Sequence, residues 1–159
     1  MEIHSDWIVG YPGETEEDFQ ETVEFMERVK FAQSYVFKYS ARPGTLAADL
    51  EDDVSDAEKA RRNQILLEVQ ERHTRFYNER AVGTVQEVLV EGPSKRESDQ
   101  VTGRTRQNKL VHLPAGEGLR TGAYADVRIT GAASHYLFGE LLEVTAGPRH
   151  RRRIPVASV

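Results

Sequence analysis

A charged stretch between two apolar runs holds the side chains best suited to binding a polyanion. It covers residues 90–113 and has the sequence VEGPSKRESDQVTGRTRQNKLVHL. Its basic residues are Lys95, Arg96, Arg104, Arg106 and Lys109, against the acidic residues Glu91, Glu97 and Asp99. Arginine, lysine and asparagine on a strand–loop–strand scaffold can donate hydrogen bonds to phosphate oxygens and base edges. The alternative is a solvated hairpin, because loops are generally polar and exposed.

Arg42 is a second candidate for binding an anion. It lies in the segment Ser40–Thr45 (SARPGT), which directly follows an apolar, strand-like run. Loops after the carboxyl ends of parallel strands commonly bind ligands. The sequence leaves two interpretations open: Arg42 holds an anion, or it pairs with a nearby acidic residue.

Metal chemistry is not favoured by the remaining titratable residues. Glu16, Glu17, Asp18 and Glu21 crowd the first turns of a predicted helix, where the helix dipole favours negative charge, so we interpret them as a solvated face. His73 has no partner at ligand spacing and is predicted to be a packing or surface residue. The chain has no cysteine, which excludes disulfides, cysteine-ligated zinc and iron–sulfur clusters held by its own side chains.

The net charge of −5 is unevenly distributed along the 159 residues. Residues 1–80 hold 10 basic and 18 acidic residues, whereas residues 81–159 hold 11 and 8. The second half is therefore the candidate for contact with a polyanion. No apolar run approaches the roughly 18 residues that span a bilayer, and the start of the chain lacks the pattern of a signal peptide. We expect a soluble, cytoplasmic protein with no membrane partner.

Residues 1–52 are predicted to form a strand–helix–strand unit. Asp6–Tyr11 is a short apolar run before a Pro-Gly turn, and Ala32–Tyr39 is again strand-like. Between them Thr15 opens a helix, with Asp18 at the far position of a capping box. This order predicts a βαβ unit with parallel strands and a right-handed crossover. Two parallel strands do not form a stable sheet alone, so we expect the chain to begin inside a larger fold.

Residues 53–80 are predicted to form a long linking helix. Ser55 and Glu58 have the spacing of a capping box, and apolar residues then recur at helical spacing to about Glu79.

Residues 81–146 are predicted to form a small, OB-like antiparallel β-barrel. Their expected strands are Val82–Val90 with a bulge at Gly83, Leu110–Leu113, Tyr124–Ile129 with Ala125, Val127 and Ile129 inward, and Tyr136–Val144 with a bend or bulge at Gly139. Closure into a barrel removes exposed strand edges, and barrels of this size often bind nucleic acid on an open strand face. In the remaining tail, residues 147–159, the run Arg149–Arg153 (RHRRR) either adds phosphate contacts or is a disordered end.

Four motifs in order resemble the radical S-adenosylmethionine methylthiotransferases of the MiaB type. Residues 6–19 (DWIVGYPGETEEDF) are similar to a late strand and helix start of that family's barrel, and Tyr39–Thr45 is similar to its YSxRPGT segment. Residues 90–95 with Gly103–Lys109 (GRTRQNK), and residues 127–140, resemble the family's TRAM domain. The resemblance covers roughly residues 1–145.

The resemblance implies a specific activity for the full-length family members. They attach a methylthio group to C2 of N6-isopentenyladenosine beside the tRNA anticodon. They combine an N-terminal domain with one 4Fe–4S cluster, a partial TIM-type barrel with a second cluster on a CxxxCxxC motif, and a TRAM barrel for RNA. Residues 1–52 would then be the end of the TIM-type barrel. With no cysteine, the chain is expected to bind neither cluster nor S-adenosylmethionine, to be inactive alone, and to be a C-terminal fragment whose partner is the missing N-terminal part.

The resemblance also implies site residues, none of them catalytic and none a metal ligand. Val9, Gly10 and Tyr39 would frame S-adenosylmethionine, and Arg42 would line the substrate mouth. The residues expected to bind the tRNA anticodon stem-loop are Lys95, Arg96, Arg104, Arg106, Asn108 and Lys109.

Two other functions remain open at this stage. The first is a fragment of the related enzyme that modifies an aspartate of a ribosomal protein, although that enzyme resembles a different, less basic pattern at Gly103–Lys109. The second is a stand-alone RNA-binding module, for which the βαβ unit would have no evident purpose.

Overall fold

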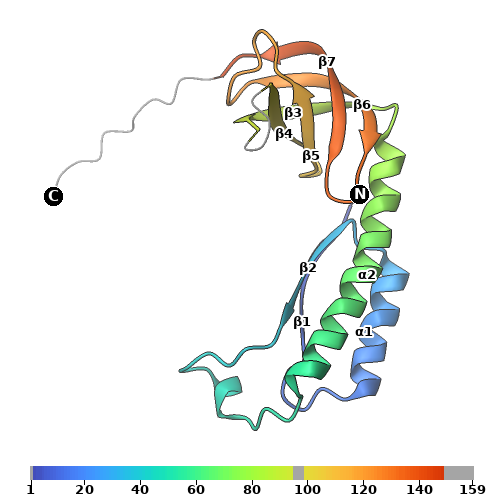
Figure 1. The fold of residues 1–159 in the computed structure, drawn as a ribbon, viewed down its shortest axis with the longest axis vertical. Coiled ribbons are helices and arrows are strands. Elements are labelled where there is room, and N and C mark those ends of the chain that lie inside the picture. The colour runs from blue at the N-terminus through green and yellow to red at the C-terminus, as the bar shows by residue number, and fades with distance from the viewer. Residues whose placement is uncertain (1, 95–98, 149–159) are drawn as a thin grey trace, which may run out of the picture. The chain divides into compact units, whose positions relative to one another are not determined.

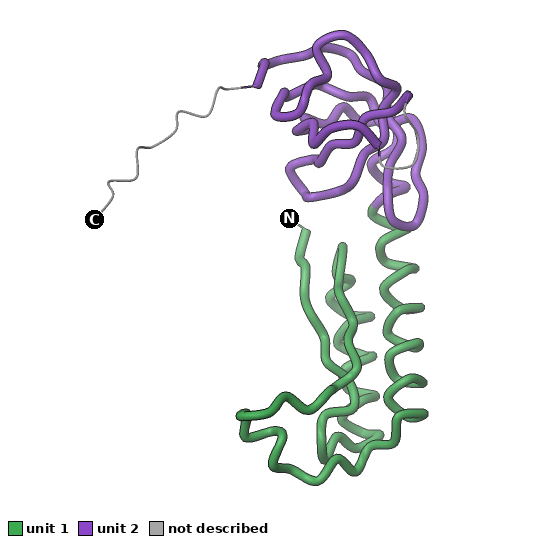
Figure 2. The backbone as a smooth tube through the Cα atoms, turned by 60° about the vertical axis from the view of Figure 1, so that its left-hand side comes forward, with its two compact units in different colours: residues 1–77 green, residues 78–159 purple. Residues whose placement is uncertain are grey.

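The computed structural model describes residues 2–94 and 99–148. The chain divides into two compact units, Met1–Tyr77 and Asn78–Val159 (Figure 2). Each unit has its own hydrophobic core. In the described ranges, no helix combines the length and the apolar composition needed to cross a membrane.

The first unit is a βαβ arrangement followed by a long helix (Figure 1). Its elements are β1 His4–Val9, α1 Glu16–Val29, β2 Gln33–Lys38, the 3-10 helix η1 Leu46–Asp49, and most of α2 Asp56–Ala81. Strands β1 and β2 pair in parallel, from His4 opposite Gln33 to Val9 opposite Lys38. The parallel βαβ unit predicted from the sequence is confirmed, whereas its origin in a TIM-type barrel stays a prediction.

Helix α1 begins with the capping box expected at Thr15 and Asp18. The Thr15 hydroxyl accepts a hydrogen bond from the Asp18 amide at 3.1 Å, and the Asp18 carboxylate accepts one from the Thr15 amide at 2.9 Å. These bonds satisfy amides that the first helical turn leaves without partners. They fix the point at which the chain leaves the loop after β1 and enters α1.

The β1–β2 sheet has one face in the core and one face exposed. On the covered side, α1 and α2 contribute to a core of Val9, Phe19, Met26, Phe31, Leu66 and Val69. On the other side Ile8, Tyr35 and Phe37 are 62%, 57% and 53% exposed. Parallel sheets are normally covered on both faces, so this exposed side is unusual for a parallel pair.

Helix α2 extends further than the sequence predicts. The helix continues to Ala81, and Gly83 follows in the left-handed region at φ +84°, donating its amide to the Ile129 carbonyl at 2.8 Å. The predicted strand Val82–Val90 is therefore confirmed only from Val85 onward, and its predicted start at Val82 and bulge at Gly83 are wrong. Glycine suits this turn because residues with a Cβ rarely adopt positive φ.

The second unit is a closed β-barrel. Its strands are β3 Val85–Pro93, β4 Gln100–Thr105, β5 Leu110–Pro114, β6 Tyr124–Ala132 and β7 Leu137–Ala146, in the spatial order β3-β4-β5-β7-β6. Strand β4 was not predicted. The pairs are antiparallel except β5–β7, which is parallel, so the expected all-antiparallel barrel needs correction at this one pair.

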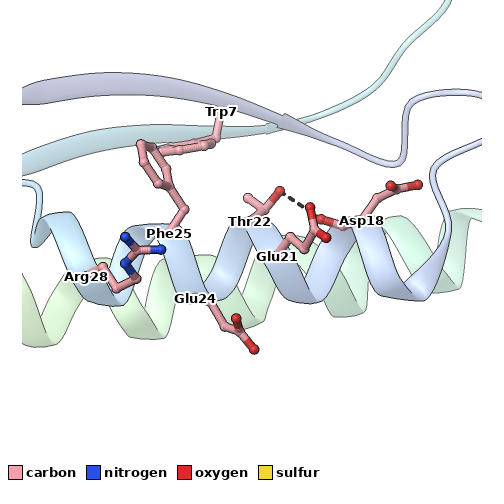
Figure 3. A pocket seen from close by; sticks show the side chains of 7 residues that line it. All are labelled: Trp7, Asp18, Glu21, Thr22, Glu24, Phe25 and Arg28. Atoms are coloured by element: carbon pink, nitrogen blue, oxygen red, sulfur yellow. Dashed lines mark hydrogen bonds between the residues drawn. The ribbon is translucent and has the colours of Figure 1, made fainter.

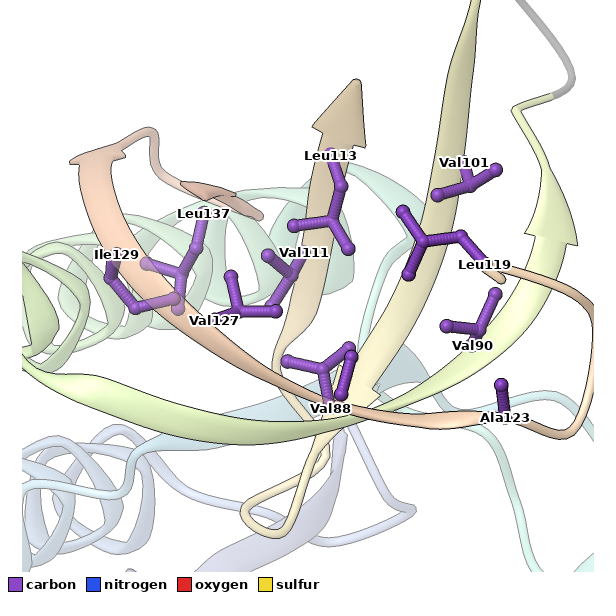
Figure 4. Packing of buried hydrophobic residues seen from close by; sticks show 11 residues of the cluster. Val88, Val90, Val101, Val111, Leu113, Leu119, Ala123, Val127, Ile129 and Leu137 are labelled. Carbon is purple, nitrogen blue, oxygen red and sulfur yellow. The ribbon is translucent and has the colours of Figure 1, made fainter. Parts of the chain in front are cut away.

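The barrel core is built mostly from residues that alternate along the strands, with Leu119 and Ala123 added from the connection between β5 and β6 (Figure 4). Its members are Val88, Val90, Val101, Val111, Leu113, Leu119, Ala123, Ala125, Val127, Ile129 and Leu137. The predicted inward positions Ala125, Val127 and Ile129 are confirmed, each at most 1% exposed. The irregularity expected near Gly139 lies opposite it on β6, between Ile129 and Gly131. With alternate positions inside, the remaining positions form the outer surface of the barrel.

Candidate nucleic-acid interface

The turn between β4 and β5 presents the predicted RNA-binding residues that the structure describes. Thr105, only 6% exposed, organises this turn. Its amide donates to the Lys109 carbonyl at 3.0 Å, its carbonyl accepts from the Asn108 amide at 2.9 Å, and its hydroxyl accepts from the Lys109 amide at 3.2 Å. Asn108 has φ +62°, a conformation that asparagine tolerates better than most residues. The turn therefore has a defined backbone, with Arg104 and Arg106 on either side of Thr105.

Each of the two arginines is paired with a glutamate of β3. Arg106 donates from Nε to Glu87 Oε1 at 2.8 Å, a hydrogen bond that raises the pKa of Arg106, and its side chain remains 74% exposed. Arg104 lies 3.5 Å from Glu91 and donates from Nη1 to the Asn108 carbonyl at 3.0 Å. These contacts orient both guanidinium groups but partly neutralise them, so a phosphate bound there would share the arginines with Glu87 and Glu91.

The other predicted cations are placed differently. Lys109 donates from Nζ to Asn78 Oδ1 at 2.9 Å, and Asn78 in turn donates to the Ala133 carbonyl at 2.9 Å. This chain of bonds connects the turn to the end of α2 and to the segment after β6. Lys95 and Arg96, and the basic tail Arg149–Arg153, lie outside the described residues.

Gly103 allows the close approach of β4 to β3 just before the turn. A Cβ at this position would lie 2.4 Å from Val88 Cγ1 and 2.7 Å from the Leu89 carbonyl oxygen. Neither distance is compatible with ordinary packing, so only glycine fits without moving the backbone. The first residue of the GRTRQNK motif therefore has a structural role, while Arg104, Arg106 and Lys109 carry its positive charge.

The residues expected to frame S-adenosylmethionine have their polar groups engaged within the chain. Val9 is 1% exposed and belongs to the core. Gly10 donates its amide to Glu14 Oε2 at 2.5 Å, and the Tyr39 hydroxyl donates to the Ala47 carbonyl at 2.8 Å. These donors do not offer the cofactor a free partner in this structure, and their assignment stays a prediction.

A buried ion-pair network around Arg62 was missed from the sequence. The Arg62 side chain is 6% exposed and donates to Glu14 Oε2 at 2.7 Å, to the Glu14 carbonyl at 3.0 Å and to Glu58 Oε1 at 2.8 Å. Together with the Gly10–Glu14 bond, it holds the loop after β1 against α2. An arginine on the apolar face of a predicted helix indicates such a partner, because a buried charge without one is very costly.

Arg42 and His73 lie in contrasting surroundings. Arg42 is exposed on a turn in which the Thr45 amide and hydroxyl donate to its carbonyl at 3.2 and 2.8 Å. His73 is 6% exposed, and its Nε2 lies 3.0 Å from Glu27 Oε2. Within residues 2–94 and 99–148, no group of histidine, aspartate or glutamate side chains is arranged to hold a metal ion. The anion-binding role of Arg42 stays a prediction.

The side chains that line a shallow recess between β1 and α1 mainly contact one another (Figure 3). Its volume is about 560 Å³. Trp7 and Phe25 pack edge to face with centroids 6.1 Å apart, and the Thr22 hydroxyl donates to the Asp18 carbonyl at 3.1 Å. Glu24 points away from the strands (Figure 3). The polar groups do not converge on one point, so the recess offers no catalytic arrangement.

Comparison with known proteins identifies the domain that the barrel resembles. A family model of the TRAM domain matches residues 79–142, which contain β3 to β6 and part of β7.

Relatives named tRNA-2-methylthio-N(6)-dimethylallyladenosine synthase match over most of this chain. The protein of Thermoanaerobacter sp. (strain X514) is 47% identical over 142 residues, which are 89% of this chain and 30% of the relative. The proteins of Haemophilus influenzae (strain PittEE) and Nitrosomonas eutropha are 44% and 43% identical, over 89% and 91% of this chain and 30% and 32% of their own lengths. The chain thus spans about a third of the length of these relatives. These matches confirm the resemblance found in the sequence, which is to the C-terminal part of the MiaB-type tRNA methylthiotransferases.

Proposed function

We propose that this chain supplies the RNA-binding and barrel-closing part of a tRNA-2-methylthio-N6-dimethylallyladenosine synthase. The whole enzyme would methylthiolate C2 of N6-isopentenyladenosine next to the anticodon. The names of the relatives and their identities of 43–47% support this activity for the whole protein. The expected location is the cytoplasm, where tRNA is modified.

The observation that carries the proposal is the β4–β5 turn of the TRAM barrel. Arg104 and Arg106 extend from a backbone that Thr105 fixes, and the Arg106 side chain is 74% exposed. A guanidinium can give paired hydrogen bonds to a phosphate, and a fixed backbone reduces the entropy lost on binding. We assign this turn to the phosphates of the tRNA anticodon stem-loop, with Asn108 and Lys109 beside it. Lys95 and Arg96 are assigned to the same partner from the motif alone.

The first unit is assigned to the barrel of the complete enzyme. Its exposed sheet face, with Ile8, Tyr35 and Phe37 more than half exposed, supports a role as the last strands of a larger parallel barrel. In that barrel the missing N-terminal part would cover the face, and Arg42 would lie near the substrate.

The iron–sulfur clusters of the family do not fit this chain. Their ligands are cysteine thiolates, and the sequence has no cysteine. S-adenosylmethionine cleavage in the family depends on such a cluster, so we propose that the chain is inactive alone. Its own contribution is to bind and orient the RNA.

The salt dependence of RNA binding tests the assignment of the turn. In fluorescence anisotropy with a labelled anticodon stem-loop, Arg104→Ala and Arg106→Ala should each reduce the slope of log K against log salt by about 0.7–0.9 per lost phosphate contact. Arg75→Ala is a matched control, because Arg75 is also exposed and pairs with an acidic residue, Glu71, in the first unit. Glu87→Gln should strengthen binding, since it removes the negative charge beside Arg106 while the amide oxygen can still accept the hydrogen bond that orients the guanidinium. An unchanged slope in both arginine variants would reject the assignment.

A further inference from the structure

Three aromatic side chains gather on the outer surface of the barrel where β5 meets β7. The His112 and Tyr136 ring centroids are 4.9 Å apart, those of Tyr136 and Phe138 are 5.2 Å apart, and those of His112 and Phe138 are 6.5 Å apart. Phe138 is 43% exposed, although its neighbour Leu137 is fully buried in the core. We call His112, Tyr136 and Phe138 the aromatic cluster.

Strand register places the aromatic cluster beside the cationic turn. His112 lies opposite Phe138 on β7 and opposite Thr102 on β4, while Arg104 lies opposite Leu110. Arg104 and His112 are therefore diagonal neighbours on the same outer face. Residues in such diagonal positions on adjacent strands are roughly 7–8 Å apart. An arginine and a group of aromatic rings thus share one continuous surface.

Packing within the barrel covers only part of the Phe138 ring. Gly131 lies opposite Phe138 on β6, and a Cβ there would lie 3.4 Å from Phe138 Cδ2. The ring therefore covers the backbone at Gly131, as aromatic residues do beside a strand glycine. The 43% of Phe138 that remains exposed is not used by this contact. An exposed ring of this size commonly marks a binding surface.

We propose that the aromatic cluster is a stacking platform for an unpaired base of the RNA whose backbone contacts Arg104. This inference rests on the proposed function, because it presumes that RNA binds this barrel. Proteins that bind single-stranded nucleic acid combine a cationic path for the backbone with aromatic rings on which bases stack. Duplex RNA buries its base faces, so the platform selects a loop or bulge over a stem.

The test compares two RNA probes with the 159-residue chain. One probe is a hairpin with an unpaired loop, and the other is a blunt duplex with the same stem. Phe138→Ala should weaken binding of the hairpin by about 5- to 150-fold, the usual effect of removing one base–aromatic stack. Binding of the duplex should not change. Leu142→Ala is the matched control, since Leu142 is a 46% exposed apolar residue of the same strand.

A spectroscopic readout separates stacking from simple apolar contact. With 2-aminopurine in the hairpin loop, the wild-type chain should quench the fluorescence on binding. Phe138→Leu keeps the apolar bulk and should lose both the quenching and the affinity. Phe138→Trp keeps an aromatic ring and should retain both. Circular dichroism of each variant checks that the barrel is folded.

The outcomes distinguish this inference from the proposed function. Equal weakening of hairpin and duplex, or no effect of Phe138→Ala and Phe138→Leu, would overturn the stacking platform. If Arg104→Ala still lowers the salt slope in that case, the RNA-binding function stands without the platform. If the wild-type chain binds neither probe, both proposals fail.

Discussion

Replacement of Arg62 by alanine should destabilise the first unit strongly. The arginine is 6% exposed and neutralises Glu14, which is itself only 13% exposed. The Gly10 amide and Arg62 Nη1 both donate to Glu14 Oε2. Without Arg62, the Gly10 amide is the remaining described partner of that oxygen. Glu58 is affected less, because its side chain is 29% exposed and it also pairs with Arg61.

The expected loss of stability follows from the burial of Glu14. Removing one partner of a buried ion pair typically costs about 3–5 kcal/mol, because the remaining charge is left without compensation. We expect about 3 kcal/mol here, at the lower end, since the Gly10 amide still binds Glu14. For a unit of this size the free energy of unfolding falls by about 1–1.5 kcal/mol per M of urea. A loss of about 3 kcal/mol should therefore lower the urea concentration at the unfolding midpoint by about 2–3 M.

Trp7 provides the assay for this prediction. It is the only tryptophan, and it packs against Phe25 and Phe31 with ring centroids 6.1 and 5.4 Å away, so its fluorescence reports on the first unit. Arg61→Ala is the matched control, because Arg61 is adjacent in sequence but 44% exposed, and its loss should matter much less.

A double substitution tests the cause of the effect. Adding Glu14→Gln to Arg62→Ala should recover part of the lost stability, since it removes the uncompensated charge. Equal midpoints for Arg61→Ala and Arg62→Ala would show that burial of this network contributes nothing, and would refute the reasoning.

Two further predictions concern the barrel and the pH dependence of the first unit. Gly103→Ala should speed amide hydrogen exchange in β3 and β4 by about 5- to 150-fold, the effect of 1–3 kcal/mol of overpacking, whereas Gly116→Ala, with its nearest contact at 3.7 Å, should not. Similar exchange in the two variants would contradict the close approach at Gly103. Hydrogen bonds from its two arginine partners lower the pKa of Glu58 from 4.5 to about 2. The folded chain therefore binds fewer protons than the unfolded chain, so stability should fall as the pH drops from 4.5 to 2, and Glu58→Gln should flatten that decline in urea titrations.

Local patterns predicted the elements whose stabilising contacts are near in sequence. The capping box at Thr15 and Asp18 needs only residues three apart, and the alternation of Ala125, Val127 and Ile129 is visible within one strand. The division of the chain into a parallel βαβ unit and a barrel followed from the same patterns.

Strand β4 was not predicted because its inward positions lack the alternating large apolar residues that indicate a half-buried strand. The inward positions are Val101, Gly103 and Thr105, of which only Val101 is a typical core residue. Gly103 is required by the approach of β3, and Thr105 by the hydrogen bonds of the following turn. Both requirements arise from tertiary contacts that hydrophobic periodicity does not contain.

The chemistry of the interface was predicted only as a set of residue types. Arg104 and Arg106 were evident as cations, but their pairing with Glu91 and Glu87 depends on the register of β3 against β4. The aromatic cluster was not predicted at all. His112 meets Phe138 only through the parallel pairing of β5 and β7, and a parallel pair between these strands was not expected.

In the proposed RNA complex, the pairing of Arg104 and Arg106 with glutamates would favour recognition of an RNA shape over attraction to charge alone. Residues 81–159 carry an excess of only three positive charges, and Glu87 and Glu91 partly neutralise the two arginines of the turn. Non-specific attraction to any polyanion is thereby reduced, because that attraction scales with the number of free cations. The same ion pairs hold Arg104 and Arg106 in place, so a phosphate at the right position meets oriented donors and less side-chain entropy is lost. In that complex the turn would contribute geometry more than charge, and discrimination between RNAs would depend on which bases reach the adjoining rings of His112 and Phe138.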